Sequence, residues 1–355
     1  MDAGLARTVL VRGDGPVGCT AALLLARAGL AVRWPAAAHR SEAAFRPIAL
    51  SYASRLVLER ARVWAALATV PIETIHVSRA GACGRALLAA ADCALPALGY
   101  VVGYAELVEA LRAHARAAAI PPPAAGEQPA LVVHAEGEGS LPATRDYGQD
   151  ALVARIAAAP AIRHRAWERF TDEGPLALLP LPDGYGLVWA MAPERAAALE
   201  AAPPARFLAA LQETTGEAPG RFQAVRDLGR VRLVSRLRSP AVAAREVWIG
   251  NAAHTLHPVA GQGLNLGLRD AYALARTLAC AADPGDAATL ARYAAGRRLD
   301  RLATGAATDF LARAFTGRAR AGAALGGLAI AALDLCAPAR RFLARRMIYG
   351  APALP

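Results

Sequence analysis

A glycine-rich turn near the start of the chain constrains the fold more than any other feature of the sequence. The apolar residues 8–11 predict a strand that stops at Gly13, and the Ala/Leu-rich residues 16–28 predict a helix closed by Gly29. The apolar residues 30–34 then take the place of the second parallel strand in a right-handed βαβ unit. The chain therefore begins as a nucleotide-binding fold does.

Gly13, Gly15 and Gly18 form a G-x-G-x-x-G pattern between this strand and this helix. The first two glycines permit a tight turn and close approach to a pyrophosphate, and the third lets the helix pack on the strand. An ordinary glycine turn is the alternative interpretation. Dinucleotide-binding folds carry a ribose-binding acid about 20 residues further on, but residues 34–38 contain no carboxylate. Arg12 is also unusual in a strand that is normally buried on both faces.

The composition is that of a folded chain with one large domain or two intergrown domains, because 55% of its 355 residues are hydrophobic and 19% are charged. Disorder, collagen and coiled coil are excluded. The formal net charge is +11, but all 40 basic side chains are arginine. A bias across the whole composition explains part of this charge, so we expect no nucleic acid partner.

The cysteines and the chain start give expectations about location. The five cysteines are scattered without a C-x-x-C pair, so we expect no disulfide framework, no zinc cage and a reducing compartment. The N-terminus lacks the successive regions of a signal peptide. Residues 321–333 are uncharged but shorter than the roughly 18 to 20 residues of a spanning helix. We therefore expect a cytoplasmic protein without a membrane span.

The middle and end of the chain show a mixed α/β pattern without a fixed repeat. The segment 121–129, rich in Pro, Ala and Gly, predicts a break, and Pro182-Asp183-Gly184 predicts a turn between two strands. The chain is expected to be helical after residue 249, with breaks near Pro284 and Pro338. Further predicted strands are 72–77, 131–135, 176–181, 185–189, 230–237 and 247–249, and further predicted helices are 105–119, 194–201 and 207–215.

A second glycine-rich segment, residues 250–271, is much more specific than the first. A strand ending at Gly250 would let the backbone approach a ligand, and Asn251 offers an amide for a hydroxyl group. His254 and His257 have H-x-x-H spacing, but no third ligand has a sensible spacing, so we expect no metal.

This segment resembles the second flavin-binding motif of class A flavoprotein monooxygenases, which have the para-hydroxybenzoate hydroxylase fold. Within them it is most similar to the ubiquinone-biosynthesis hydroxylases of the 2-octaprenyl-6-methoxyphenol hydroxylase type, whose motif also carries Asn at the position of Asn251. The resemblance covers about three quarters of the chain. Further similar stretches follow in the same order: 45–51 with Trp64, 74–78, 168–171 with 174–177, and 187–189.

The resemblance implies FAD and NAD(P)H as cofactors and hydroxylation of a polyprenylated phenol in ubiquinone biosynthesis. In the family, the segment equivalent to His257 and Pro258 lies beside the reactive edge of the flavin, which makes these two the implied catalytic residues. The helix that starts near Gly261 directs its positive end to where a reduced flavin accumulates negative charge. The implied cofactor-binding residues are Gly13, Gly15, Gly18, Arg46, Gly250, Asn251, Gly261, Gln262, Gly263 and Asn265.

Some side chains have a second interpretation. Arg46 corresponds to the family's arginine near the flavin phosphate and ribityl group, but it could equally be a surface arginine. Trp167, Trp189 and Tyr185 could line an aromatic substrate pocket, although such residues are more often core.

Three departures from the family pattern bear on activity. The ribose-binding acid is absent. The third family motif, Asp-Gly followed by Ser and Arg, is reduced to Glu136-Gly137 with Ser140, and Ala143 stands at the arginine position. Roughly thirty residues of a small β-meander are missing, since only the segment 121–129 occupies its place.

Two functional interpretations therefore remain open. The first is a flavin hydroxylase, and the second is a flavin-poor relative with an assembly or binding role in a ubiquinone-biosynthesis complex. A plain Rossmann dehydrogenase is less consistent, because it has no use for the glycines at 261 and 263. The arginine-rich, apolar segment 310–355 predicts either contact with the inner face of the cell membrane or a packed helix pair with a solvated face.

The sequence thus predicts an α/β fold in which a Rossmann-like FAD-binding domain is discontinuous. A sheet-based substrate domain is inserted into it, and helices form the C-terminus. The predicted segments are 1–145 for the first part of the FAD-binding domain, 146–229 for the substrate domain, 230–290 for the second part, and 291–355 for the C-terminal helices.

Overall fold

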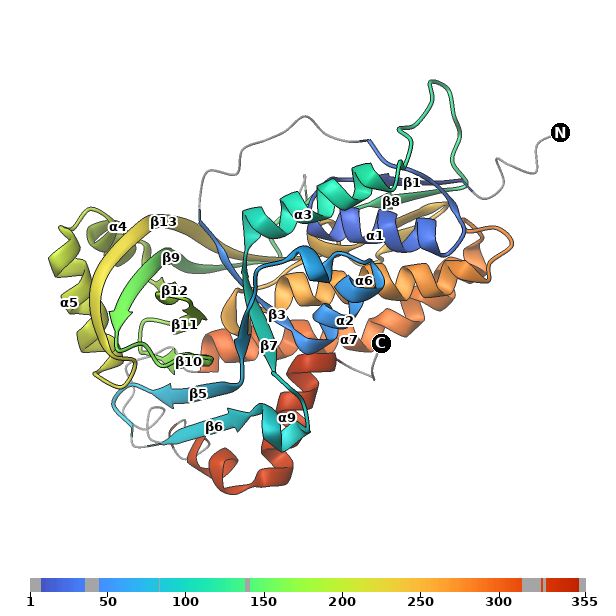
Figure 1. Cartoon of the computed structure of the whole chain (residues 1–355). Helices are drawn as coiled ribbons and strands as arrows, with labels where there is room; N and C mark the ends of the chain where they lie inside the picture. The colour runs from blue at the N-terminus through green and yellow to red at the C-terminus, as the bar shows by residue number, and fades with distance from the viewer. Residues whose placement is uncertain are drawn as a thin grey trace.

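The structure is a computed structural model that describes residues 8–35, 45–82, 84–137, 141–314, 327 and 330–350. Within these residues the strands form three sheets, and helices pack around them (Figure 1). The helices are α1 (Pro16–Arg27), α2 (Tyr52–Arg60), α3 (Tyr104–Ala117), α4 (Pro193–Glu200), α5 (Pro204–Thr215), α6 (Gln262–Ala279), α7 (Ala287–Ala314) and α9 (Ala337–Tyr349). Short 3₁₀ turns are η2 (Trp64–Ala66), η3 (Ala90–Cys93), η4 (Gly250–Ala252) and η5 (Val259–Gly261).

The first sheet confirms the predicted βαβ unit. Its order is β14-β15-β8-β1-β2, and β1 pairs in parallel with both β2 and β8. Figure 1 shows α1 lying between α3 and α6 beside this sheet. The strands are β1 (Thr8–Arg12), β2 (Ala31–Arg33), β8 (Leu131–His134), β14 (Val242–Ala243) and β15 (Glu246–Trp248).

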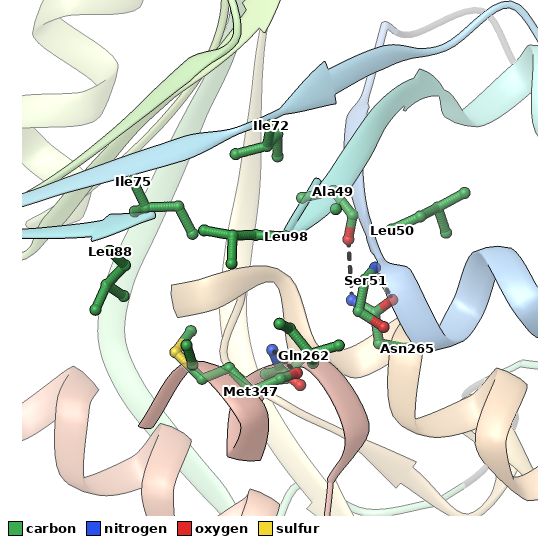
Figure 2. A pocket seen from close by; sticks show the side chains of 13 residues that line it. Ala49, Leu50, Ser51, Ile72, Ile75, Leu88, Leu98, Gln262, Asn265 and Met347 are labelled. Atoms are coloured by element: carbon green, nitrogen blue, oxygen red, sulfur yellow. Dashed lines mark hydrogen bonds between the residues drawn. The ribbon is translucent and has the colours of Figure 1, made fainter. Parts of the chain in front are cut away.

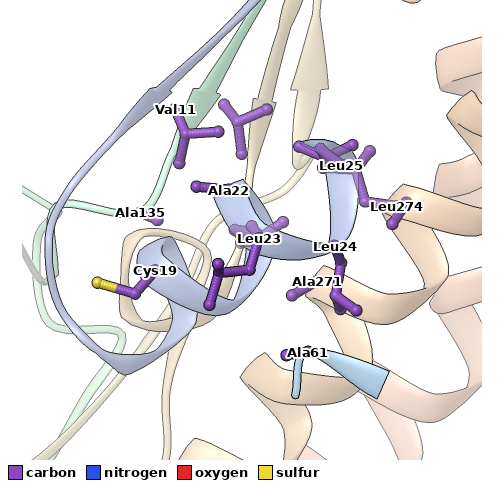
Figure 3. Packing of buried hydrophobic residues seen from close by; sticks show 14 of the residues in the cluster. Val11, Cys19, Ala22, Leu23, Leu24, Leu25, Ala61, Ala135, Ala271 and Leu274 are labelled. Carbon is purple, nitrogen blue, oxygen red and sulfur yellow. The ribbon is translucent and has the colours of Figure 1, made fainter. Parts of the chain in front are cut away.

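Helix α1 is apolar around most of its circumference because other elements surround it. Its side chains Leu23, Leu24 and Leu25 are buried, and α6 contributes Ala271 and Leu274 to the same core (Figure 3). Burial of a leucine side chain contributes about 1.5–3 kcal/mol. Packing of this kind therefore holds α6 against α1, the helix that follows the first glycine turn.

The second sheet has eight strands in the order β16-β13-β9-β12-β11-β10-β5-β6. Figure 1 shows α4 and α5 packed against the outer face of its long, curved strands. The strands are β5 (Thr74–Arg79), β6 (Arg85–Ala89), β9 (Arg145–Ala159), β10 (Arg165–Phe170), β11 (Pro175–Leu181), β12 (Gly184–Met191), β13 (Arg221–Leu237) and β16 (His254–Thr255).

The third sheet connects the other two and has the order β3-β7-β4. Helix α2 follows β3 directly, and Ser51 caps it by accepting a hydrogen bond from the Ser54 backbone N–H. The three strands are β3 (Pro47–Ser51), β4 (Val70–Ile72) and β7 (Gly99–Gly103).

The predicted fold class is confirmed: a parallel sheet with a glycine turn, a second sheet inserted in the chain, and helices at the C-terminal end. The sheets divide the chain differently from the predicted segments, however. Strands β5 and β6 lie within the segment 1–145, yet β5 pairs with β10 in the eight-stranded sheet. The segment predicted as one strand over 72–77 is divided between β4 and β5 at Glu73.

Candidate functional site

The glycine turn at residues 13–18 is closed by packing at two of its glycines and open at the third. Gly13 has φ +106°, and a Cβ there would lie 2.2 Å from the Ala135 carbonyl oxygen. A Cβ on Gly18 would lie 2.3 Å from the carbonyl oxygen of Gly13. At Gly15 a Cβ would meet nothing within 4 Å, and no side chain caps the N-terminus of α1 there. The turn therefore presents free backbone N–H groups to an open space, as a pyrophosphate site requires.

Trp34 lies where the ribose-binding acid was expected. Its side chain is 2% exposed, and its Nε1 donates a hydrogen bond of 3.0 Å to the Gly13 carbonyl. On the other side, Arg112 of α3 donates to the Asp14 carbonyl at 3.1 Å and to its carboxylate at 2.7 Å. The turn is therefore held by two side chains, neither of which can take the role of a ribose-binding carboxylate. Arg12, the unusual residue of β1, is exposed.

The second glycine segment lies directly against the first. Gly250 has φ +58°, and a Cβ on it would lie 3.0 Å from the Val17 side chain. A Cβ on Gly267 of α6 would lie 2.7 Å from the same side chain. The absence of side chains at these positions lets the loop and α6 approach α1, so both motifs meet at one place. Asn251, beside this contact, is exposed.

Asn265 is predicted as a cofactor-binding residue, but its side chain is used within the protein. The amide nitrogen donates to the carbonyl oxygens of Ala49 at 2.9 Å and Gly261 at 2.7 Å. The amide oxygen accepts from the Ser51 N–H at 2.8 Å and the Ser54 hydroxyl at 2.6 Å. Asn265 therefore ties β3 and α2 to α6, and its side-chain amide is occupied by contacts within the protein.

The start of α6 is the second open helix N-terminus of the site. Gly261 adopts the left-handed conformation with φ +59°, and a Cβ on it would lie 3.5 Å from the Ala49 side chain. A Cβ on Gly263 would meet nothing within 4 Å, and no side chain caps the helix. Free N–H groups and the helix dipole favour negative charge at such a position.

His257 is buried and neutral. Burial lowers its pKa to about 4, against the opposing effect of the Asp309 carboxylate. Its Nδ1 accepts a hydrogen bond from the Val259 N–H at 3.1 Å, which leaves the ring proton on Nε2. Nε2 is buried without a hydrogen-bond partner in the described part of the chain, and the Tyr147 ring packs edge-on at 4.8 Å. Pro258 follows it, half-buried.

His254 has a structural partner. Its Nε2 lies 2.6 Å from the Asp270 carboxylate, and the side chains of His254 and Asp270 are both buried. The Asp270 carboxylate also accepts a hydrogen bond from Arg297 at 2.8 Å. Burial disfavours the charged Asp270 carboxylate, but Arg297 and His254 outweigh that effect and hold its pKa well below the usual value. Arg269 and Asp300 extend this buried network. No group of three possible metal ligands occurs among the described residues.

An apolar pocket lies beside Asn265 (Figure 2). Its cavity volume is about 70 Å³, and it is open to solvent on one side. Gln262, at its edge, donates a hydrogen bond of 3.3 Å to the Met347 carbonyl of α9. The remaining lining is mainly aliphatic and comes from β3 to β7 and α9: Ala49, Leu50, Ser51, Ile72, Ile75, Leu88, Leu98, Gly99, Ala344, Met347 and Ile348.

The other predicted positions lie at the surface or outside the described residues. Arg46 is exposed, with its guanidinium 5.2 Å from the centre of the Tyr104 ring. Glu136 and Ala143, of the reduced third motif, are exposed, and Ser140 lies outside the described residues.

Trp167, Trp189 and Tyr185 belong to the core rather than to a pocket. They pack with Phe207 and other apolar residues of α4 and α5. The buried Tyr185 hydroxyl donates to the Pro219 carbonyl at 2.8 Å and accepts from the Ile162 N–H at 3.0 Å. Their side chains therefore stabilise the sheet from its outer face.

Glu168 has a buried carboxyl oxygen, and in the sequence it stood out only as part of a family likeness. Its Oε1 is buried without a hydrogen-bond partner in the described structure, and burial raises its pKa to about 8. A signal was present in the sequence, since Glu168 shares one face of its strand with the apolar residues Ala166 and Phe170.

Comparison with known proteins gives several matches. Residues 150–304 match the family model described as FAD binding domain. The 3-demethoxyubiquinol 3-hydroxylase of Escherichia coli is 30% identical over 364 residues, which cover 87% of this chain and 90% of that protein. Ubiquinone hydroxylase UbiL of Rhodospirillum rubrum is 36% identical over 207 residues, 57% of this chain. That alignment spans 48% of the relative, and other curated relatives are likewise matched over about half their length.

A solved structure shows the same fold. The p-nitrophenol 4-monooxygenase PnpA from Pseudomonas putida superimposes with a TM-score of 0.74. The superposition covers 98% of this chain and 99% of that one at 17% sequence identity. In the described part of this chain, no helix combines the length and the apolar character needed to cross a bilayer.

Proposed function

Because the chain belongs to the family of ubiquinone-biosynthesis hydroxylases, we propose that it is an FAD-dependent monooxygenase that hydroxylates the ring of a polyprenylated phenol with NAD(P)H as reductant. The observation that carries this proposal is the meeting of the two glycine segments. Val17 contacts the positions of both Gly250 and Gly267, while Gly15 and Gly263 each face open space at a helix N-terminus. Two open N-termini suit the two anionic parts of a reduced flavin dinucleotide.

The residues present fit this cofactor at the pyrophosphate and at the ring. Gly13, Gly15 and Gly18 would hold the pyrophosphate, and the backbone from Gly261 to Asn265 would face the ring. When bound, FAD supplies the electron transfer and oxygen chemistry that side chains lack. The remaining predicted contacts, from Arg46, Gly250, Asn251 and Gln262, belong to this proposal.

His257 and Pro258 serve this chemistry by shaping the wall of the site. His257 stays neutral at physiological pH, because its pKa is about 4. It therefore adds no positive charge, and its Nε2–H is the one polar group it can direct at a ligand. A buried neutral donor excludes water and can orient an acceptor atom.

The apolar pocket and α9 suit a prenylated substrate. The aliphatic lining of the pocket matches the tail of such a phenol. On α9, Phe342 is 74% exposed, and Arg341 and Arg345 are exposed beside it. Exposed apolar and basic side chains on one helix are suited to the inner face of a cell membrane, where this substrate resides.

A second function is favoured by two observations. Trp34 fills the place of the ribose-binding acid, and the third motif is reduced. Both features weaken nucleotide binding. A flavin-poor relative that binds the phenol or assembles a ubiquinone-biosynthesis complex is therefore the alternative.

The experiment that separates the two is FAD binding measured by visible absorption after removal of unbound flavin. We expect the wild-type chain to retain FAD in a one-to-one ratio and to oxidise NAD(P)H when a prenylated methoxyphenol is added. Gly15→Val should fold normally, because Gly15 has extended backbone and an unfilled neighbourhood, but lose bound FAD.

Gly229→Val is the matched control. Gly229 also lacks a positive φ and has open space around it, but it lies on β13 away from both glycine segments. It should retain FAD. A wild-type chain that stays colourless after incubation with excess FAD would contradict the hydroxylase proposal and favour the binding role.

A further inference from the structure

One row of residues on the inner face of the eight-stranded sheet keeps accessible surface where burial would be expected. Val77, Glu168, Ala177 and Val188 are successive partners across β5, β10, β11 and β12. All four are only partly buried, although each of these strands has a neighbour on both sides. From the partial burial of these four side chains we infer a gap in the layer that covers the sheet, called the hollow below.

The rows on either side are covered. Phe170, two residues beyond Glu168 on β10, is buried against Val259 of η5. Ala166, two residues before it, is buried in a cluster with Ala49 of β3. The hollow therefore lies between these two contacts, and η5, which contacts both β11 and β3, lies next to it. The η5 turn follows His257 and Pro258 directly in the chain.

Glu168 is the polar member of this row. Val77, Ala177 and Val188 offer only apolar surface, and Ile75, two residues before Val77, lines the pocket in Figure 2. An aromatic ring with one hydroxyl group fits this arrangement of apolar walls and a single carboxyl.

The charged groups nearby have other partners. Burial is the cause of the raised pKa of Glu168, and no charged side chain contributes to it. On β9, Arg155 bonds to Asp227 at 3.1 Å. Tyr147 of β9 donates a hydrogen bond to Asp309 of α7 at 3.2 Å. His257 is neutral.

We propose that Glu168 binds the hydroxyl group of the phenolic substrate and accepts its proton. This rests on the proposed function, which supplies a phenol as substrate. The O–H bond of the phenol breaks, the proton passes to the Glu168 carboxylate, and the electron pair stays on the phenolate oxygen. No electrons are gained or lost by the protein, and the proton can return when the product leaves.

The energetics suit the transfer. A phenol titrates near pH 10 in water, and a carboxyl group whose pKa is raised to about 8 is a far better match than an ordinary glutamate. The phenolate is richer in electrons at the positions beside its oxygen, which favours attachment of an oxygen atom to the ring. Glu168 is therefore assigned as a catalytic residue that touches the substrate.

The test compares a phenol with its methyl ether. The full-length protein is titrated with a 2-methoxyphenol carrying a geranyl chain, and with the O-methyl ether of that phenol, while tryptophan fluorescence is followed. Trp167 is adjacent to Glu168 and reports on the sheet. We expect the wild type to prefer the phenol by roughly 10- to 100-fold, as for a hydrogen bond to a charged group. Glu168→Leu should bind the phenol and its methyl ether with about equal affinity.

The pH dependence gives a readout that a structural role would not change. The preference of the wild type should rise as the pH increases through about 8, because the ionised carboxylate is the stronger acceptor. Glu168→Gln keeps the shape of the side chain and should show a smaller preference without that rise. Glu217→Gln, at an exposed loop position, is the control and should behave as the wild type.

An equal affinity of the wild type for the phenol and its ether would overturn the assignment. A preference that both Glu168 variants retain would do the same. The proposed function is tested independently by bound FAD, so an FAD-containing protein with an unchanged preference in these variants contradicts only the role of Glu168. Thermal melts of each variant show that binding is compared between folded proteins.

Discussion

The two faces of the eight-stranded sheet are built from alternating residues of the same strands but differ in how they are packed. On the outer face, Trp167, Leu178 and Leu187 are buried against α4 and α5. On the inner face, Glu168, Ala177 and Val188 are partly accessible and line the hollow inferred above. The comparison teaches that large aromatic side chains here provide stability, whereas small side chains and one carboxyl group provide room for a ligand.

The largest expected effect on the free energy of unfolding comes from truncating one of two neighbouring leucines of β11. Leu178 is fully buried on the outer face, so Leu178→Ala should lower the free energy of unfolding by about 2–5 kcal/mol. Leu179 points to the inner face and is half-buried, so Leu179→Ala should lower it by no more than about 1.5 kcal/mol. Urea denaturation measures both values. Equal losses would show that the two faces are packed alike.

A second pair of variants tests the same comparison of the two faces by removing one tyrosine hydroxyl group from each. Tyr185→Phe leaves the Pro219 carbonyl and the Ile162 N–H without their partner on the outer face, which should cost about 1–3 kcal/mol. Tyr147→Phe removes one bond to the partly exposed Asp309 on the inner side and should cost less than about 1 kcal/mol. Thermal melts at one pH decide the order. The reverse order would mean that the inner side carries more of the stability.

The smallest effect concerns the charge of Glu168. Its pKa in the folded chain is about 8, above the reference value of 4.5, so its contribution to stability is fully present below about pH 4.5 and is lost as the pH rises through about 8. Glu168→Leu should therefore be more stable than the wild type by about 1–2 kcal/mol at alkaline pH. The difference should shrink toward acidic pH.

The control for this prediction is Glu217→Leu, since Glu217 is exposed. Its stability relative to the wild type should stay constant between pH 4.5 and 8. A wild-type protein that gains stability over the same range relative to Glu168→Leu would show that the Glu168 carboxylate has a favourable partner.

The sequence predicted the framework of the molecule well because its signals are local. Glycines at fixed spacing between a strand and a helix, as at Gly13 to Gly18, act through backbone sterics that any fold must respect. The turn at Pro182 to Gly184 between β11 and β12 depends on similar local rules.

The parts that could not be predicted depend on contacts between distant residues. Asn265 lies in a cofactor motif, but its amide is consumed by Ala49, Ser51 and Ser54, which are more than two hundred residues away. The pairing of β5 with β10 was also not evident, because parallel strands can join across any separation in sequence. For Glu168, strand alternation alone does not show which face is covered.

The bonds that hold the first glycine turn have a consequence for how a ligand would bind. Trp34 and Arg112 fix the carbonyl groups of Gly13 and Asp14 before any nucleotide arrives. The conformational entropy of ordering this loop is therefore lost during folding rather than during association. A preorganised cradle of this kind would offset part of the affinity forfeited with the ribose-binding acid, and it would do so without a single contact to the sugar.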